Sequence, residues 1–195
     1  MLKTTVCIVG HGPSLKEARK GRLIDFHDKV VRLKGTKSVL GSEDYGSKTT
    51  VICASTEVMG NFFGVEAEEY WAYPKNGSFD GNVALQVICQ LERPVVIPLY
   101  FCNQWNKRFM EMGAKHPNVS TGMAAILISI KRWSPKRIAL AGFDTLLNPE
   151  IKFDRNPEIP RTGCGPYPDH DWVKELELIR ILEKEHGVKI ECMNL

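Results

Sequence analysis

Short apolar runs alternate along the chain with longer segments of helical periodicity. The apolar runs are bounded by Gly, Pro or charged residues, and their lengths suit buried strands. The expected strands are Thr4–Val9, Lys29–Leu33, Thr49–Ala54, Glu69–Tyr73, Val95–Leu99, Arg137–Ala141 and Val188–Cys192. The expected helices are Ser14–Ile24, Gly81–Leu91, Asn103–Met112, Gly122–Trp133 and Asp171–His186. This alternation predicts an α/β fold with a central, mostly parallel sheet flanked by helices.

The segment before the last helix has little periodicity and is rich in proline. Its prolines are Pro149, Pro157, Pro160, Pro166 and Pro168. A loop of this length inside a compact domain is usually functional or disordered. We therefore expect residues 144–169 to form an active-site lid within a single domain that spans residues 1–195.

Composition excludes several classes of protein. The chain has 195 residues, of which 43% are hydrophobic and 25% charged, with a formal net charge of +3. This balance is ordinary for a globular protein and gives no basic stripe of the kind that nucleic-acid binding requires. No apolar stretch reaches the length of a membrane span. The scattered cysteines form no CxxC pair, which favours reduced thiols and a cytoplasmic location.

The first expected strand runs into a glycine turn. The sequence after Val9 is Gly10-His11-Gly12-Pro13-Ser14, and both Pro and Ser suit the start of a helix. A buried strand followed by such a turn and a helix can bind a nucleotide, because glycine lets the backbone approach a phosphate. The third glycine of the dinucleotide fingerprint is absent. A nucleotide site and an ordinary tight turn are both consistent with this pattern.

Three segments together resemble a known family. Residues 7–50 contain the glycine turn, a V-V-R-L strand and the run Gly46-Ser-Lys-Thr-Thr50. The second segment is Pro117-Asn-Val-Ser-Thr-Gly-Met-Ala124, and the third has the form H-x4-E from His170 to Glu175. In this order they resemble the large, small and terminal motifs of the animal-type sialyltransferases, glycosyltransferase family 29.

The resemblance implies a Rossmann-like fold, a variant of the GT-A type. It also implies an inverting glycosyltransferase that uses CMP-sialic acid as donor and a glycan or glycoconjugate as acceptor, with no metal and no further cofactor. The positions it implies for donor or nucleotide binding are Gly10, His11, Gly12, Pro13, Ser14, Arg32, Lys34, Ser120, Thr121, Gly122, Gly142, Phe143 and Asp144.

The resemblance also assigns roles near the C-terminus. His170 is the expected catalytic base, since histidine is the side chain best matched to proton transfer at neutral pH. Glu175 is expected to be an orienting or structural residue. Phe153, Arg155 and Tyr167 are candidate lid or acceptor residues. Asp144 suits a helix cap and a site residue equally well.

The chain also departs from the family pattern. His11 and Lys34 replace asparagines, and Phe153 replaces a histidine, so a different nucleotide-sugar donor is an alternative. A pyrophosphokinase-like enzyme shares the Gly-x-Gly-Pro-Ser-Leu turn, and a non-catalytic nucleotide-binding module is a further alternative. Asp169 and Asp171 spell D-x-D, but their place before a helix favours capping over metal binding.

Overall fold

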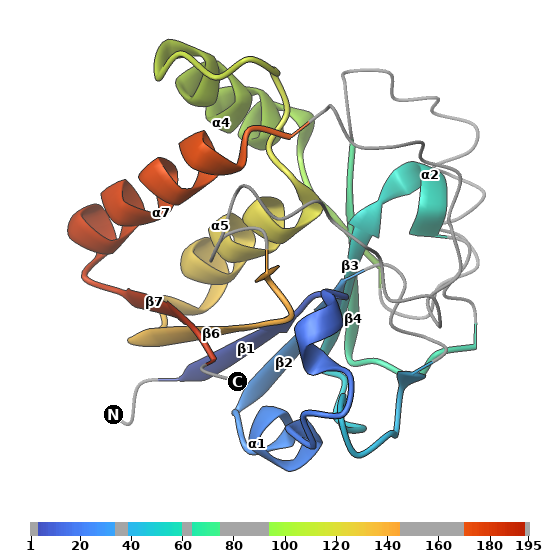
Figure 1. Ribbon diagram of the computed structural model, residues 1–195. Coiled ribbons are helices and arrows are strands. Elements are labelled where there is room, and N and C mark those ends of the chain that lie inside the picture. The colour runs from blue at the N-terminus through green and yellow to red at the C-terminus, as the bar shows by residue number, and fades with distance from the viewer. Residues whose placement is uncertain (1–3, 34–38, 60–63, 75–93, 145–169, 194–195) are drawn as a thin grey trace.

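The computed structural model describes residues 4–33, 39–59, 64–74, 94–144 and 170–193 (Figure 1). The expected helix Gly81–Leu91 and most of the expected lid, residues 145–169, lie outside these residues.

A seven-stranded parallel sheet forms the centre of the molecule. Its strands are paired in the order β5-β4-β3-β2-β1-β6-β7, and every adjacent pair is parallel. The strands are β1 (Thr5–Val9), β2 (Lys29–Leu33), β3 (Val51–Ser55), β4 (Glu69–Tyr73), β5 (Pro94–Val96), β6 (Arg137–Ala141) and β7 (Lys189–Cys192). All seven strands expected from the apolar runs are therefore confirmed; β2, β4 and β6 have the expected bounds, and the ends of the others differ by up to three residues.

Helices cover both faces of this sheet (Figure 1). One face packs against α4 (Leu99–Glu111), α5 (Thr121–Trp133) and α7 (Trp172–His186), which contribute apolar side chains to the largest buried cluster. The other face is covered by the short 3-10 helix η1 (Pro13–Leu15), α1 (Gly21–Asp25) and α2 (Thr56–Met59). The predicted α/β architecture is confirmed, and burial on both faces explains why the strands are almost continuously apolar.

The helix expected over Ser14–Ile24 is wrong. The chain instead forms η1 and α1, joined by a segment in which Glu17 and Arg19 adopt the left-handed region with φ of 63° and 52°. Their amide groups donate hydrogen bonds of 2.8 Å to the carboxylate of Asp44 rather than to helical carbonyls. Leu15 and Ile24, whose spacing suggested one helix, lie instead in two separate turns that pack on the same face of the sheet.

The strand order places a topological switch point between β1 and β6. Strands β2 to β5 extend from one side of β1, and β6 and β7 extend from the other. In open parallel sheets the ligand lies outside the carboxyl ends of the strands at such a point. The segments that follow β1 and β6, residues 10–14 and 142–144, both lie there.

Candidate active site at the carboxyl edge

The turns that follow β1 and β6 are hydrogen-bonded to each other. Gly10 N–H donates to the carbonyl of Ala141 at 2.8 Å, and Gly12 N–H donates to the carbonyl of Gly142 at 3.0 Å. The parallel pairing of Val9 with Ala141 therefore continues past the ends of both strands. The two sequence segments predicted to share a site are in contact.

Glycine is required in this pair of turns because the backbones approach each other closely. A Cβ atom on Gly10 would lie 2.6 Å from the carbonyl oxygen of Gly142, and one on Gly12 would lie 2.7 Å from the same atom. Gly142 itself has φ of +69°, a conformation that favours glycine. The Gly-x-Gly spacing is thus explained by contact with the end of β6.

Asp144 holds the far end of the first turn. Its carboxylate accepts hydrogen bonds from both the backbone N–H, at 3.0 Å, and the hydroxyl group of Ser14. The side chain of Asp144 is buried, with 6% exposure. Ser14, expected to bind the donor directly, therefore uses both of its donor groups within the protein.

The N-terminus of α5 forms the second part of the candidate site. Ser120 is the N-cap of this helix, and its hydroxyl oxygen accepts a hydrogen bond from Met123 N–H at 3.1 Å. The carboxylate of Glu175 on α7 accepts hydrogen bonds from Ser120 N–H at 2.5 Å and from its hydroxyl at 2.8 Å. The serine expected to hold an anion of the donor therefore holds a carboxylate of the protein.

Glu175 is buried between the two helices, with 1% exposure. Burial raises its pKa to about 7, and the two hydrogen bonds from Ser120 offset only part of that effect. Glu175 thus links the helix that follows His170 to the first turn of α5. The expected orienting role of Glu175 stays a prediction.

Thr121 and Gly122 connect α5 to two strand ends. The hydroxyl of Thr121 lies 2.8 Å from the hydroxyl of Tyr73, the last residue of β4, and burial raises the pKa of that tyrosine. A Cβ atom on Gly122 would lie 2.6 Å from the ring of Phe143, so glycine makes room for this ring. Tyr73 was not singled out from the sequence, because nothing in a strand pattern shows which residue its last side chain meets.

His170 immediately precedes the residue that caps α7. Asp171 is the N-cap and accepts a hydrogen bond from Lys174 N–H at 3.1 Å, so the D-x-D match includes a helix cap as expected. The other oxygen of Asp171 accepts one from Lys115 N–H, at 3.1 Å, which ties this end of α7 to the segment before α5. The imidazole ring of His170 is half-buried and packs against Trp172, with ring centroids 5.0 Å apart.

These contacts join the three motif segments in series. The Gly10–Ser14 turn contacts residues 142–144, Phe143 packs against Gly122, and Ser120 binds Glu175 in the first turn of the helix that His170 precedes. The carboxyl ends of parallel strands and the N-termini of the following helices meet at one edge of a sheet. The structure therefore gathers the segments at that edge.

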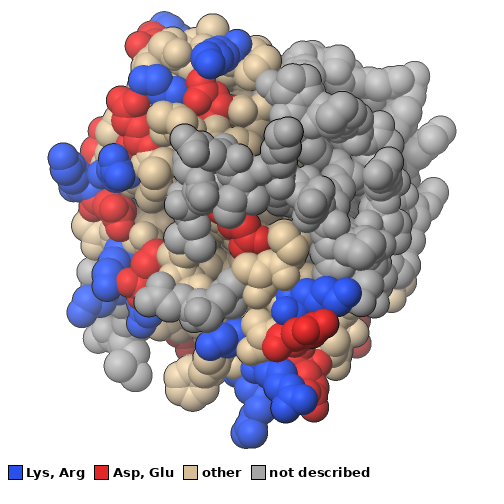
Figure 2. Space-filling model, in the orientation of Figure 1, with Lys and Arg blue, Asp and Glu red and all other residues tan. Residues whose placement is uncertain are grey.

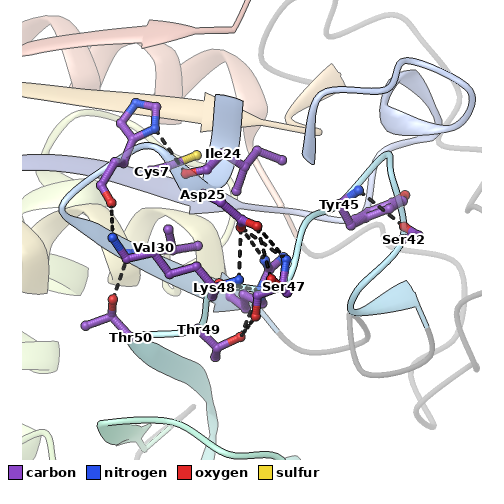
Figure 3. A network of polar contacts seen from close by, with 12 residues as sticks. Cys7, Ile24, Asp25, Val30, Ser42, Tyr45, Ser47, Lys48, Thr49 and Thr50 are labelled. Carbon is purple, nitrogen blue, oxygen red and sulfur yellow. Dashed lines mark hydrogen bonds and ion pairs between the residues drawn. The ribbon is translucent and has the colours of Figure 1, made fainter. Parts of the chain in front are cut away.

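Arg32 pairs with Val9 in the sheet, but the bonds of its side chain are made elsewhere. Its side chain is fully buried, and its Nε donates to the carbonyl of Lys48 and to the hydroxyl of Thr49, both at 3.0 Å. Figure 3 shows this region, where Asp25 accepts hydrogen bonds from the backbone of Ser47 and Lys48 and forms an ion pair of 3.6 Å with Arg32. Burial lowers the pKa of Arg32 to about 10.

The Arg32 network braces the loop that enters β3. Because Asp25 precedes β2 and residues 47–49 precede β3, these contacts lie toward the amino ends of the strands, opposite the switch point. The Gly46–Thr50 run of the large motif thus has a structural explanation. This geometry does not support the expected contact between Arg32 and a nucleotide-sugar donor.

Several expected site residues lie outside the described part of the chain. They are Lys34, Phe153, Arg155 and Tyr167. Among the described residues, no group of three His, Cys, Asp or Glu side chains is arranged to hold a metal ion.

A small cavity lies between α4 and α5, near the end of β4. It measures about 20 Å³, and its lining includes Tyr73, Phe101, Trp105, Asn118 and Val119. Such a volume admits about one water molecule. We interpret it as a packing defect beside the site.

The visible surface carries charges of both signs. In Figure 2, Lys and Arg side chains alternate with Asp and Glu side chains along the left and lower parts of the described surface. This mixture agrees with the small net charge of the chain. Among the described helices, none is both long and apolar enough to cross a bilayer.

Comparisons with known proteins agree with the motif resemblance. Residues 3–76 match the family model described as glycosyltransferase family 29 (sialyltransferase). A crystal structure of a mammalian sialyltransferase in complex with Gal-β1-3GalNAc-ortho-nitrophenol is 20% identical, with a TM-score of 0.62 over 96% of this chain and 69% of that one. A further mammalian sialyltransferase structure is 18% identical, with a TM-score of 0.61 over 96% of this chain and 68% of that one.

No curated protein matches the chain in sequence. The family match covers the first of the three motif segments, and the structural likeness shows that the fold extends over nearly the whole chain. The family match agrees with the motif resemblance over residues 3–76, and the structural likeness confirms the fold class.

Proposed function

We propose that this chain is an inverting glycosyltransferase that moves sialic acid from CMP-sialic acid to a hydroxyl group of a glycan or glycoconjugate. The observation that carries the proposal is the series of contacts joining residues 10–14, 142–144, 120–122 and 175 at the carboxyl edge. Each of the three motif segments contributes to it, and a nucleotide site is expected at that edge. The four described cysteines are free, which supports a reducing, cytoplasmic setting.

His170 is the proposed catalytic base. Inverting transfer requires one group to accept the proton of the attacking hydroxyl, and an imidazole is well matched to that task near neutral pH. The cap formed by Asp171 and the bond from Glu175 to Ser120 fix the helix that follows it. We propose that this helix positions the base, which lies two residues before its first turn.

Local hydrogen-bond donors are proposed to stabilise the leaving CMP without a metal ion. CMP carries a single phosphate, and preorganised donors can stabilise charge of that size in a site from which water is excluded. Transfer is therefore expected to persist in excess EDTA.

His170→Ala tests the base assignment. Transfer from CMP-sialic acid is expected to fall by about two orders of magnitude or more, while the dissociation constant of CMP measured by calorimetry stays nearly unchanged. His186→Ala is the matched control, because His186 is exposed at the opposite end of the same helix. Wild-type transfer rates in His170→Ala would refute the assignment.

A ligand screen tests the donor. Thermal unfolding is measured with CMP, CDP, UDP and NAD, with and without Mg²⁺, and CMP alone is expected to stabilise the protein. Stabilisation by another nucleotide would indicate the alternative donor suggested by His11. A shift that depends on Mg²⁺ and a diphosphate or triphosphate would favour the pyrophosphokinase-like alternative. Nucleotide binding without any transfer would favour the non-catalytic module.

A further inference from the structure

The segment that joins η1 to α1 has an unusual backbone conformation. Glu17 and Arg19 have φ of 63° and 52°, in the left-handed region that a Cβ atom disfavours. In the described ranges, Ser134 is the other residue besides glycine with a positive φ, and it is the C-cap of α5, where this conformation is common. Glu17 and Arg19 instead lie between two helices, and contacts with another loop stabilise them.

The carboxylate of Asp44 holds both residues. One of its oxygens accepts a hydrogen bond from Glu17 N–H and the other accepts one from Arg19 N–H, each at 2.8 Å. Backbone amides around left-handed residues can form a concave surface that binds an anion. Hydrogen bonds to a charged acceptor are stronger than those between neutral groups, so these two bonds offset the cost of the conformation.

The loop that carries Asp44 is fixed by contacts of its own. Gly46 N–H donates to the carbonyl of Ser42 at 2.8 Å, which closes the loop on both sides of Asp44. The next side chain, Tyr45, is 1% exposed and packs in the buried cluster under η1 and α1. Asp44 therefore acts on residues 17–19 from an anchored position.

The same amides have a competing set of partners. The sequence of residues 14–24 predicts one helix, in which the N–H groups of residues 17 and 19 would donate to the carbonyls of residues 13 and 15. The residue types at 16–20 are Lys, Glu, Ala, Arg and Lys, all of which favour a helix. In the structure the chain changes direction at Lys16, whose ψ is 128°. A continuous helix would remove this change, so η1 and α1 could not both keep their places on the sheet.

We propose that Asp44 is a positioning residue for the candidate site. Its carboxylate holds residues 17–19 in the conformation that separates η1 from α1, and so keeps the Gly10–Ser14 turn against the turn after β6. Asp44 acts on the site through this segment. The inference goes beyond the proposed function and depends on it only where a nucleotide is the readout.

Amide hydrogen exchange, followed by NMR, tests the inference without any ligand. In Asp44→Ala, the amides of Gly12 and Ser14 are expected to exchange about a hundredfold faster than in the wild type. Two hydrogen bonds to a charged group are lost, so the bonds of these amides to residues 142 and 144 open more often. The amides of β3 should keep their wild-type rates.

Glycine substitutions separate positioning from a general loss of stability. Glycine adopts the left-handed conformation without the cost of a Cβ atom. Asp44→Ala combined with Glu17→Gly and Arg19→Gly is therefore expected to recover most of the wild-type protection of the turn. Glu43→Gln is the matched control, because Glu43 precedes Asp44 and its exposed side chain forms only a surface ion pair of 3.6 Å with Arg19. This control should leave the exchange of the turn unchanged.

Two exchange results would overturn the inference. Faster exchange at residues 17 and 19 with no change at residues 12 and 14 would show that Asp44 ties down its own neighbours and nothing more. A folded glycine variant that does not regain protection would show that Asp44 does not act through this conformation. If Asp44→Ala does not fold, Asp44→Asn is compared in the same way. It keeps one oxygen acceptor, and a smaller increase in exchange is expected.

Nucleotide binding gives a second readout, which rests on the proposed function. In Asp44→Ala, the KM for CMP-sialic acid and the dissociation constant of CMP are expected to rise together by about threefold or more, because only molecules with the turn in place bind. The kcat at saturating donor should stay near the wild-type value. A fall in kcat alone, or unchanged KM and CMP affinity, would overturn the positioning role. A wild type that binds no CMP would refute the proposed function and leave the exchange result standing.

Discussion

At the scale of single residues, the most consequential feature is a buried carboxylate at the N-terminus of another helix. Glu175 accepts two hydrogen bonds from Ser120, and burial raises its pKa to about 7. An ionised carboxylate in this position is stabilised by the positive end of the α5 dipole, but its desolvation is larger. We therefore expect both stability and the position of the first turn of α7 to respond to changes in this contact.

The free energy of unfolding is expected to fall as pH rises from about 4.5 to about 7. The folded pKa of Glu175 lies above its ordinary value of 4.5, so the folded state binds more protons than the unfolded state in that window. Glu175→Gln removes this dependence and is expected to be the more stable variant at pH 8, by about 2 kcal/mol. Urea unfolding across this pH range measures the effect.

Glu177→Gln is the control for this pH dependence, because Glu177 is paired with Lys174 on the exposed side of the same helix. Parallel pH profiles for the wild type and Glu175→Gln would contradict the account of Glu175.

Ser120→Ala is expected to destabilise the protein by about 1–3 kcal/mol. The change removes the cap of α5 and leaves Glu175 with one hydrogen bond fewer in a buried position. Ser129→Ala is a matched control in the same helix, since the hydroxyl of Ser129 is fully buried and makes no hydrogen bond. Equal changes in thermal unfolding free energy for the two variants would argue against a specific role of Ser120.

At the scale of elements, the strands could be predicted and the first helix could not. Apolar runs such as Val6–Val9 and Ile138–Ala141 have the length of a buried strand, and the structure buries every residue of both runs. The Ser14–Ile24 segment has apolar residues at helical spacing, yet its backbone is redirected by bonds from residues 17 and 19 to Asp44. A contact with a distant side chain decided the conformation, and local propensity does not reveal it.

The same limit applies to the glycine turn. Its glycines were expected to admit a ligand, but they admit the backbone of residue 142. The Gly-x-Gly spacing indicated that another group approaches the backbone of this turn closely, but it did not show which group that is.

Gly12→Ala is expected to lower stability by about 1–3 kcal/mol and also to weaken nucleotide binding, because the added methyl group displaces the β6 turn. Gly113→Ala is the comparison. Gly113 has φ of +81° and open space around it, so its substitution is expected to lower stability alone. Chemical unfolding and calorimetric titration with CMP measure the two effects, and unimpaired nucleotide binding by Gly12→Ala would contradict the coupling of the two turns.

At the scale of the whole molecule, the carboxyl ends and the amino ends of the strands have different roles. The carboxyl edge brings together the turns after β1 and β6, the N-terminus of α5 and the end of α7 that follows His170. The contacts of Asp25 and the backbone of Ser47 and Lys48 brace the loops toward the amino edge. The family resemblance predicted which segments form the candidate site. Only the structure shows that one part of the large motif, residues 10–14, lies at this site while another part, residues 46–50, stabilises a loop.

Titration of the labelled protein with CMP, followed by NMR of the backbone amides, tests the central claim most directly. Convergence at the carboxyl edge predicts that the amide signals of residues 10–14, 120–122, 142–144 and 170 shift with one common dissociation constant, Pro13 having no amide. The signals of residues 25–29 and 47–49 should remain in place. Shifts confined to these last residues, or shifts at residues 10–14 without any at residues 120–122, would contradict the account.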